Sequence, residues 1–224
     1  MQKILAIETS GKVCSVAVFE NSSCFGYLEE KEDFKHAAIL TILIEKLLNR
    51  LDIRPNQLDA IALSGGPGSY TGLRIGTSTA KGLCYALDKP LLAIDTLQII
   101  ANGFVETHKK NGLICPMVDA RRMEVFTSLF DENLKAVTAP KPLILDENSY
   151  KPELENSIIH FVGNGSEKAA DVILHSNARF YSDDFLSAKN MGDLALRKLQ
   201  NQDFADTVYF EPFYLKEFFM TGKK

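Results

Sequence analysis

The strongest constraint on the fold is that the first half of the chain resembles the second half when residue 4 is aligned with residue 115. Residues 4–20 read ILAIETSGKVCSVAVFE, and residues 115–131 read CPMVDARRMEVFTSLFD. Each segment is an apolar run ending in a carboxylate, followed by a polar turn and a second run of alternating apolar residues, which is typical of a β-hairpin. Glu8 and Asp119 occupy equivalent positions in this alignment. The recurrence favours a duplicated fold.

The order of the elements that follow is also the same in the two halves. After the first hairpin we expect a strand at 24–30, a helix at 34–51, a strand at 59–64, a helix at 71–87, a strand at 91–94 and a helix at 97–108. After the second hairpin we expect a strand at 134–139, a strand at 158–162, a helix at 167–174, a strand at 179–182 and a helix at 188–199. The first half therefore reads β-β-β-α-β-α-β-α. The second half is interpreted as the same unit, with no helix assigned between 139 and 158, and the pattern predicts an α/β fold with mixed sheets and flanking helices.

This duplicated unit resembles the ribonuclease H-like domains of the actin-like ATPase superfamily, in which two such domains face a cleft that holds ATP. The turn dipeptide Asn111-Gly112 predicts the boundary between the halves. We expect a first domain over 1–110 and a smaller second domain over 111–208. The segment 209–224 packs on the first domain in this prediction, although the sequence leaves the second domain open. A fold of this kind does not by itself fix an activity.

A glycine-rich loop, SGGPGSYTGLRIG at 64–76, follows the apolar run at 60–63 and precedes a predicted helix. This position is typical of a loop that binds phosphate at a helix N-terminus. The spacing nevertheless fits neither nucleotide-binding template, because Thr71 stands where Walker A loops and dinucleotide-binding loops both need a glycine. The glycines therefore predict a tight turn and close packing of the helix.

Members of the superfamily that hydrolyse ATP carry phosphate sites at the two hairpin turns, and both turns are altered here. In the first turn Glu8 replaces an aspartate and the glycine is displaced to Gly11; in the second, Arg121 fills the space of a glycine. The residues that remain of a nucleotide site are Glu8, Thr9, Ser10, Asp119, Arg121, Gly163 and Gly165. We expect no ATP turnover and no tightly bound cofactor, while weak anion binding at the first turn, or nucleotide binding at a partner interface, stays open.

Composition argues against several other classes of protein. The four cysteines form no Cys-x-x-Cys pair, and the four histidines lack the i, i+4 spacing of a helical metal-ligand pair. A formal net charge of −4 disfavours a module that binds RNA alone. No apolar stretch approaches the roughly 20 residues of a membrane span, and the N-terminus lacks an apolar signal core. We expect a cytoplasmic protein without a metal site.

Two consecutive predicted helices carry surface suited to a protein partner. Apolar residues cover about half the circumference of the helix at 34–51, more than seating on one sheet requires. In the helix at 71–87, small residues recur at i, i+4 and i+8, a spacing that lets another helix approach closely. Packing of this stripe on the protein's own sheet is the alternative. The predicted partner interface consists of His36, Leu40, Leu43, Leu47, Gly72, Leu73, Gly76, Ala80 and Leu83.

The glycine-rich run with the Lys-Gly-Leu that follows it, at 65–83, resembles the signature of the bacterial TsaB family, formerly called glycoprotease-like and also known as YeaZ. Weaker similarities occur in the family's order along nearly the whole chain: ILAIETS at 4–10, IDTLQ at 94–98, VDARRMEVF at 118–126, FVGNG at 161–165 and EPFYLK at 211–216. Phe126 stands where the family usually has tyrosine.

The resemblance implies a non-catalytic scaffold or activating subunit. The family pairs with the catalytic transferase TsaD through helices that correspond here to 34–51 and 71–87, and the ATPase TsaE completes the complex. The product is threonylcarbamoyladenosine in tRNAs that read codons beginning with A. Homodimers are expected when the partner is absent, and tRNA binding is expected only through the complex. The alternative function is a stand-alone peptidase or an ATP-dependent small-molecule kinase that uses Asp119.

Overall fold

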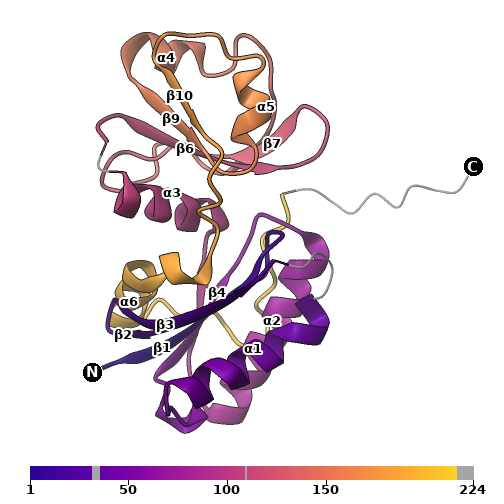
Figure 1. The fold of residues 1–224 in the computed structure, drawn as a ribbon, viewed down its shortest axis with the longest axis vertical. Coiled ribbons are helices and arrows are strands. Elements are labelled where there is room, and N and C mark those ends of the chain that lie inside the picture. The colour runs from indigo at the N-terminus through magenta and orange to yellow at the C-terminus, as the bar shows by residue number, and fades with distance from the viewer. Residues whose placement is uncertain (32–35, 109, 216–224) are drawn as a thin grey trace, which may run out of the picture.

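The first half of the chain builds one five-stranded sheet with helices on both faces (Figure 1). A computed structural model describes residues 1–31, 36–108 and 110–215. The elements of the first half are β1 (Lys3–Glu8), β2 (Cys14–Glu20), β3 (Ser23–Glu30), α1 (His36–Arg50), the 3-10 turn η1 (Pro55–Gln57), β4 (Ala60–Ser64), α2 (Tyr70–Leu87), β5 (Leu91–Ile94) and α3 (Thr96–Thr107). The start predicted for the first helix, residue 34, lies outside the described residues.

The second half repeats this arrangement with shorter elements. They are β6 (Leu113–Asp119), β7 (Glu124–Thr127), β8 (Lys141–Ile144), α4 (Lys151–Asn156), β9 (Ile159–Val162), α5 (Ser166–Ala170), β10 (Ala178–Tyr181), the 3-10 turn η2 (Ala188–Asn190) and α6 (Gly192–Gln200).

The two sheets have the same topology. Their strand orders are β3-β2-β1-β4-β5 and, in the matching direction, β8-β7-β6-β9-β10. In each sheet the first strand of the half pairs antiparallel with its hairpin partner and parallel with the strand after the next helix. The predicted fold class, duplicated ribonuclease H-like domains with mixed sheets, is confirmed.

Strand β1 shows why the central strands read as continuous apolar runs. Leu5 and Ile7 face the core beneath α1 and α2, whereas Ile4 and Ala6 face a second core on the opposite side of the sheet. Both faces are covered, so no position along the strand favours a polar residue until it ends at Glu8.

The closing helices of the two halves pack on each other's sheets. Helix α3 contacts β6 and β9, and helix α6 contacts β1, β3 and β5. One apolar core therefore contains Phe104 of α3, Leu194 of α6 and side chains from both sheets, including Phe19 and Ile114. The division into two domains at residue 110 stays a prediction. The packing of α3 and α6 joins residues from both sides of this predicted boundary.

The third strand of the second half is placed wrongly by the sequence. Residues 134–139 form no strand, and β8 begins later, at Lys141. The cause is a turn at Asp131, whose Oδ1 accepts hydrogen bonds from the N–H groups of Asn133 and Lys135 at 2.9 and 2.8 Å. Leu134 within this turn has a φ of 61°. Helix α5 ends earlier than predicted, and the last predicted helix is divided into η2 and α6.

The segment after α6 runs back along the first half. The N–H of Ala205 donates to the carbonyl of Leu91 in β5 at 2.9 Å, and the N–H of Phe213 donates to the carbonyl of Gly65 at 2.7 Å. Residues 205–215 thus lie beside β5, the glycine-rich loop and α2, while residues 216–224 lie outside the described part. Among the described helices, none combines the length and the apolar character needed to span a membrane.

Candidate functional site

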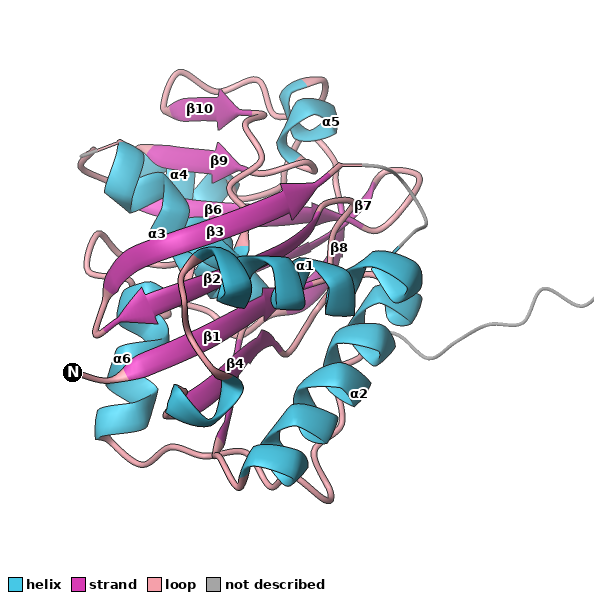
Figure 2. Cartoon of the chain, turned by 60° about the horizontal axis from the view of Figure 1, so that its bottom comes forward, coloured by secondary structure: helices cyan, strands magenta, loops and turns pink. Residues whose placement is uncertain are grey.

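The predicted partner-binding residues lie mainly inside the protein. Helices α1 and α2 lie side by side on one face of the first sheet (Figure 2). Leu40, Leu43 and Leu47 pack between α1 and that sheet, and Ala80 belongs to the same core. Leu73 is also buried. Their burial corrects the prediction that these side chains form an exposed contact surface.

The glycines of α2 face the protein's own hairpin. A Cβ atom on Gly72 would lie 2.0 Å from the carbonyl oxygen of Thr9, and one on Gly76 would lie 2.2 Å from Thr9 Oγ1. The Thr9 hydroxyl donates a hydrogen bond to the Gly72 carbonyl at 2.8 Å. The prediction that these glycines receive a partner helix is therefore corrected: they let α2 approach the β1–β2 turn.

Two further members of the predicted set lie at the edge of this packing. His36 is buried, with Nε2 3.2 Å from the carbonyl oxygen of Gly11. Leu83 alone of the set is half-buried, and it lines a groove of about 220 Å³ between α1 and α2. Leu5 and Leu58 line the same groove, and Thr41 and Thr79 contribute from the two helices.

Sequence reasoning missed the residues that α1 and α2 do expose. Ile42 on α1 is 45% exposed, and Tyr85 on α2 is 88% exposed. A signal was present for Ile42, which lies outside the apolar arc of its helix and therefore points away from the sheet. The outward surface of the two helices thus includes the groove and, separately, these two exposed side chains, which are not among the residues that line it.

The first hairpin turn, residues 8–11, is closed by the rest of the chain. The N–H of Ser69, just before α2, donates to the carbonyl of Ser10 at 2.7 Å. From the other side, Leu186 lies so close that its Cδ2 would be 2.8 Å from a Cβ on Gly11. Because Thr9 also packs against α2, protein atoms surround this turn.

Glu8 is completely buried at the end of β1. Its Oε1 accepts hydrogen bonds from the N–H and the hydroxyl of Ser10 at 2.5 and 2.6 Å. Its Oε2 has no hydrogen-bond partner among the described residues. Burial raises the pKa of Glu8 to about 7, against the opposing effect of the Ser10 hydrogen bonds. The carboxyl is therefore a titrating group near neutral pH.

The second hairpin turn is exposed and has a different environment. The side chain of Asp119 is 47% exposed, and its Oδ1 accepts from Lys168 Nζ at 3.0 Å and from the N–H of Arg121 at 2.6 Å. The N–H of Asp119 donates to Asn164 Oδ1 at 2.8 Å. The two turns are thus alike in topology, but the carboxylate of the second is already engaged by a cation of α5.

The two remaining glycines of the predicted nucleotide site serve packing within the second half. A Cβ on Gly163, which has a φ of +96°, would lie 2.8 Å from the carbonyl oxygen of Met117. A Cβ on Gly165 would lie 2.9 Å from both Met117 Cβ and Val125 Cγ1. Both glycines therefore let the β9–α5 turn lie on β6 and β7. In the described ranges, no three His, Cys, Asp or Glu side chains are grouped as a metal site requires.

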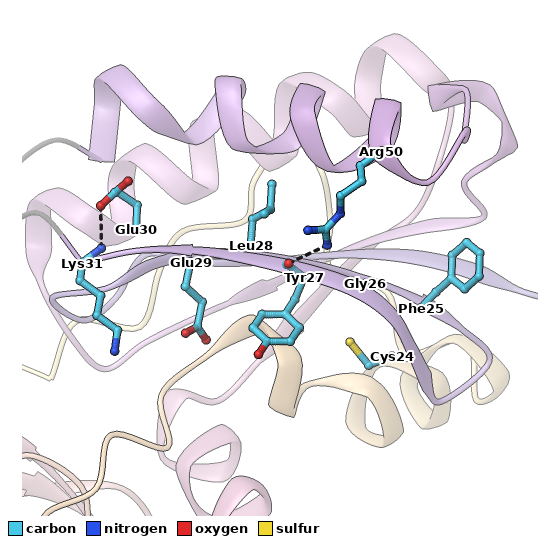
Figure 3. Close-up of a pocket in the computed structure, with 9 residues that line it drawn as sticks. All are labelled: Cys24, Phe25, Gly26, Tyr27, Leu28, Glu29, Glu30, Lys31 and Arg50. Carbon is cyan, nitrogen blue, oxygen red and sulfur yellow. Dashed lines mark hydrogen bonds between the residues drawn. The ribbon is translucent and has the colours of Figure 1, made fainter.

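A larger hollow of about 920 Å³ runs along the edge strand β3 (Figure 3). Arg50 Nη2 donates to the carbonyl of Tyr27 at 2.9 Å, and charged side chains, Glu29, Glu30 and Lys31, follow it along the strand. A register shift between Val18 and Phe19 interrupts the pairing of β2 with β3. Charged residues and β-bulges commonly prevent an edge strand from pairing with a strand of another molecule, so this hollow lies along a protected sheet edge.

The chain matches known proteins over most of its length. A family model described as TsaD, tRNA N6-adenosine threonylcarbamoyltransferase, matches residues 29–217. A Bacillus subtilis (strain 168) protein named tRNA threonylcarbamoyladenosine biosynthesis protein TsaB is 37% identical over 128 residues, 57% of this chain and 54% of that protein. A Haemophilus influenzae protein of the same name is 33% identical over 125 residues, 56% of this chain and 52% of that protein.

The matched stretches thus span about half the length of these curated relatives. A crystal structure from Pseudomonas aeruginosa, described as similar to the peptidase YeaZ, has a TM-score of 0.87 at 23% identity and covers 96% of this chain and 100% of that one. This likeness concerns the fold. Because the family model covers well over half of the chain and the named relatives agree with it, the chain belongs to the tRNA N6-adenosine threonylcarbamoyltransferase family, within its TsaB/YeaZ branch.

Proposed function

We propose that this chain is a non-catalytic scaffold or activating subunit for threonylcarbamoyladenosine formation in tRNAs that read codons beginning with A. It acts in a cytoplasmic complex with a TsaD-type transferase and the ATPase TsaE, and it contacts tRNA within that complex. The family model and the names of the relatives support a role in this modification. The observation that carries the non-catalytic part is the closed first turn, which Ser69, Leu186 and α2 contact directly.

The second turn supports the same conclusion. A kinase or peptidase that used Asp119 needs its carboxylate free to accept a proton or to hold a metal ion. Here Lys168 Nζ and the N–H of Arg121 both bind Asp119 Oδ1. The two turns therefore support the proposal that this chain alone binds no nucleotide tightly.

The surface for the transferase is the α1–α2 groove in this proposal. Its floor is apolar, and its volume of about 220 Å³ admits apolar side chains from a partner helix. The same groove binds a second copy of this chain when the transferase is absent. Leu40, Leu43 and Leu47 act indirectly, because they hold α1 on the sheet.

The test is heterodimer formation with the TsaD-type transferase, measured by analytical ultracentrifugation. Leu83→Arg places a charge in the groove and is expected to weaken pairing at least tenfold. Leu174→Arg is the matched control, since Leu174 is 87% exposed and lies in the second half of the chain. Gly76→Arg is unsuitable, because any side chain at that position meets Thr9 and unfolding would imitate loss of binding.

Unchanged pairing by a folded Leu83→Arg variant would show that the groove is not the interface. The enzyme alternative is tested with the purified chain alone, incubated with ATP or with peptide substrates. Turnover that Asp119→Ala abolishes would support the kinase or peptidase and contradict the scaffold.

A further inference from the structure

The tip of the β6–β7 hairpin holds two consecutive arginines in an unfavourable backbone conformation. Arg121 has a φ of 70° and Arg122 a φ of 48°. Both lie in the left-handed region, where hairpin turns normally carry glycine, asparagine or aspartate because a Cβ atom is disfavoured there. Backbone strain of this kind persists only where the surroundings impose it, and it is concentrated at functional positions.

Lys168 of α5 is the residue that imposes this conformation. Its Nζ donates to the carbonyl of Arg122 at 2.9 Å, to the carbonyl of Glu124 at 2.5 Å and to Asp119 Oδ1 at 3.0 Å. Its side chain is only 15% exposed. A half-buried ammonium with three acceptors, together with the bond from the Arg121 N–H to Asp119, fixes the backbone of the tip.

Lys168 binds the backbone of the tip, but it does not bind the two arginine side chains. Arg121 and Arg122 are both exposed. Across the described ranges, neither guanidinium has a hydrogen-bond or ion-pair partner within the chain. The nearest carboxylate in sequence, Asp119, is already bound by Lys168. The backbone from which these two unpaired arginine side chains extend is therefore strained and well supported.

We propose that Arg121 and Arg122 form a phosphate-binding site that contacts the sugar-phosphate backbone of tRNA. This inference rests on the proposed function, which brings the chain next to tRNA. Guanidinium groups bind phosphate oxygens through paired N–H donors, and a fixed pair suits successive phosphates of one strand. The hairpin belongs to the second sheet, whereas α1 and α2 cover the first, so tRNA and the transferase bind different halves (Figure 1).

The acidic charge of the whole chain agrees with a local contact of this kind. With a net charge of −4, the isolated chain attracts RNA weakly, and two arginines supply too little binding energy alone. In the complex the transferase provides the main affinity, and the hairpin adds contacts that orient the tRNA backbone.

The test is binding of a tRNA transcript to the assembled pair of this chain and the transferase, by fluorescence anisotropy over a series of salt concentrations. The double variant Arg121→Gly, Arg122→Gly removes both charges and also relieves the backbone strain. We expect its Tm to rise while its tRNA affinity falls about tenfold or more at low salt. The slope of log K against log salt should fall by about 1 to 2.

Two further variants separate charge from shape. Arg197→Ala on α6 removes one positive charge elsewhere and should leave the salt slope unchanged. Lys168→Met keeps both arginines but releases the backbone of the tip, and it should weaken tRNA binding less than the double variant does.

Two results would overturn this proposal, and a third would overturn the proposed function instead. An unchanged affinity and salt slope in a folded, paired double variant would refute the phosphate site. Loss of transferase pairing with intact tRNA binding would show that the hairpin contacts an acidic protein surface. Failure of the unmodified chain to pair with the transferase would refute the proposed function instead, before the arginines are tested.

Discussion

The two hairpin turns occupy the same place in a duplicated fold, yet one is buried and the other is exposed. The turn after β1 buries Glu8 completely, whereas the turn after β6 leaves Asp119 about half exposed. The first turn faces protein atoms, and the second faces solvent. The duplicated backbone thus supplies equivalent positions in the two halves, and the neighbouring elements decide what each position can bind.

The helices that follow explain the difference. Helix α2 has 18 residues, and Gly72 and Gly76 on its inner side let the first turn lie directly against it. The equivalent helix in the second half, α5, has five residues. It reaches the second turn only through the long side chain of Lys168, so the tip of that hairpin stays open.

The largest effect is expected from closing the space between α2 and the first turn. Gly72→Ala places a methyl group 2.0 Å from the carbonyl oxygen of Thr9, a backbone atom that cannot move alone. We expect a loss of about 3 kcal/mol or more in the free energy of unfolding, measured in urea. Gly82→Ala in the same helix meets nothing within 4 Å and should stabilise the protein by up to about 1 kcal/mol. Equal stabilities for the two variants would contradict the buried contact.

The next effect concerns the carboxyl that only the first turn buries. Because the pKa of Glu8 rises from 4.5 to about 7 on folding, its ionisation destabilises the folded state. The favourable contribution of the protonated group is complete below about pH 4.5 and is lost as the pH rises through 7. Glu8→Gln keeps a neutral side chain, so the variant should be more stable than the original protein by about 2–3 kcal/mol at pH 8.

Thermal melts of both proteins from pH 4 to pH 8.5 check this sign. The stability difference should shrink to near zero below pH 4.5, where Glu8 itself is protonated. A constant difference across this range would show that folding does not shift the pKa of Glu8.

The smallest effect is expected at the exposed turn. Lys168→Met removes an ion pair and two hydrogen bonds to carbonyl groups while keeping the apolar stem of the side chain. We expect a loss of about 1–2 kcal/mol, because the tip is exposed and water replaces part of these interactions. Lys189→Met is a suitable control, since the Lys189 side chain is more exposed than that of Lys168 and its ammonium is 4.0 Å from Glu29. A loss as large as that of Gly72→Ala would mean that the second turn is as tightly integrated as the first.

Much of the architecture could be predicted because it depends on local pattern. Alternating apolar residues, acidic strand ends and the repeat led to the correct fold class, two mixed sheets with flanking helices. The strand placed at 134–139 was wrong because the apolar residues there are interrupted by a turn that the Asp131 side chain stabilises. Such side-chain-to-backbone bonds compete with strand formation and leave little trace in hydrophobic periodicity.

The functional surface was harder to predict for a different reason. Periodicity identified Leu40, Leu43 and Leu47 as one apolar face of a helix, but it does not show whether that face meets a sheet or a partner. The spacing of Gly72 and Gly76 likewise signals close approach without naming what approaches. In the structure the leucines and the glycines face the interior of the protein. The exposed Ile42 and Tyr85 lie on the remaining surface of these helices.

The amino-acid sequence alone determined the duplicated α/β fold, the loss of the usual phosphate-binding residues and the resemblance to the TsaB family. These features follow from residue type and spacing along the chain. Only the tertiary structure decided that Thr9 fills the glycine notch of α2, that Glu8 loses contact with water, and that Lys168 holds the arginine hairpin. Each of these depends on contacts between segments far apart in the chain, and local sequence patterns carry no record of such distances.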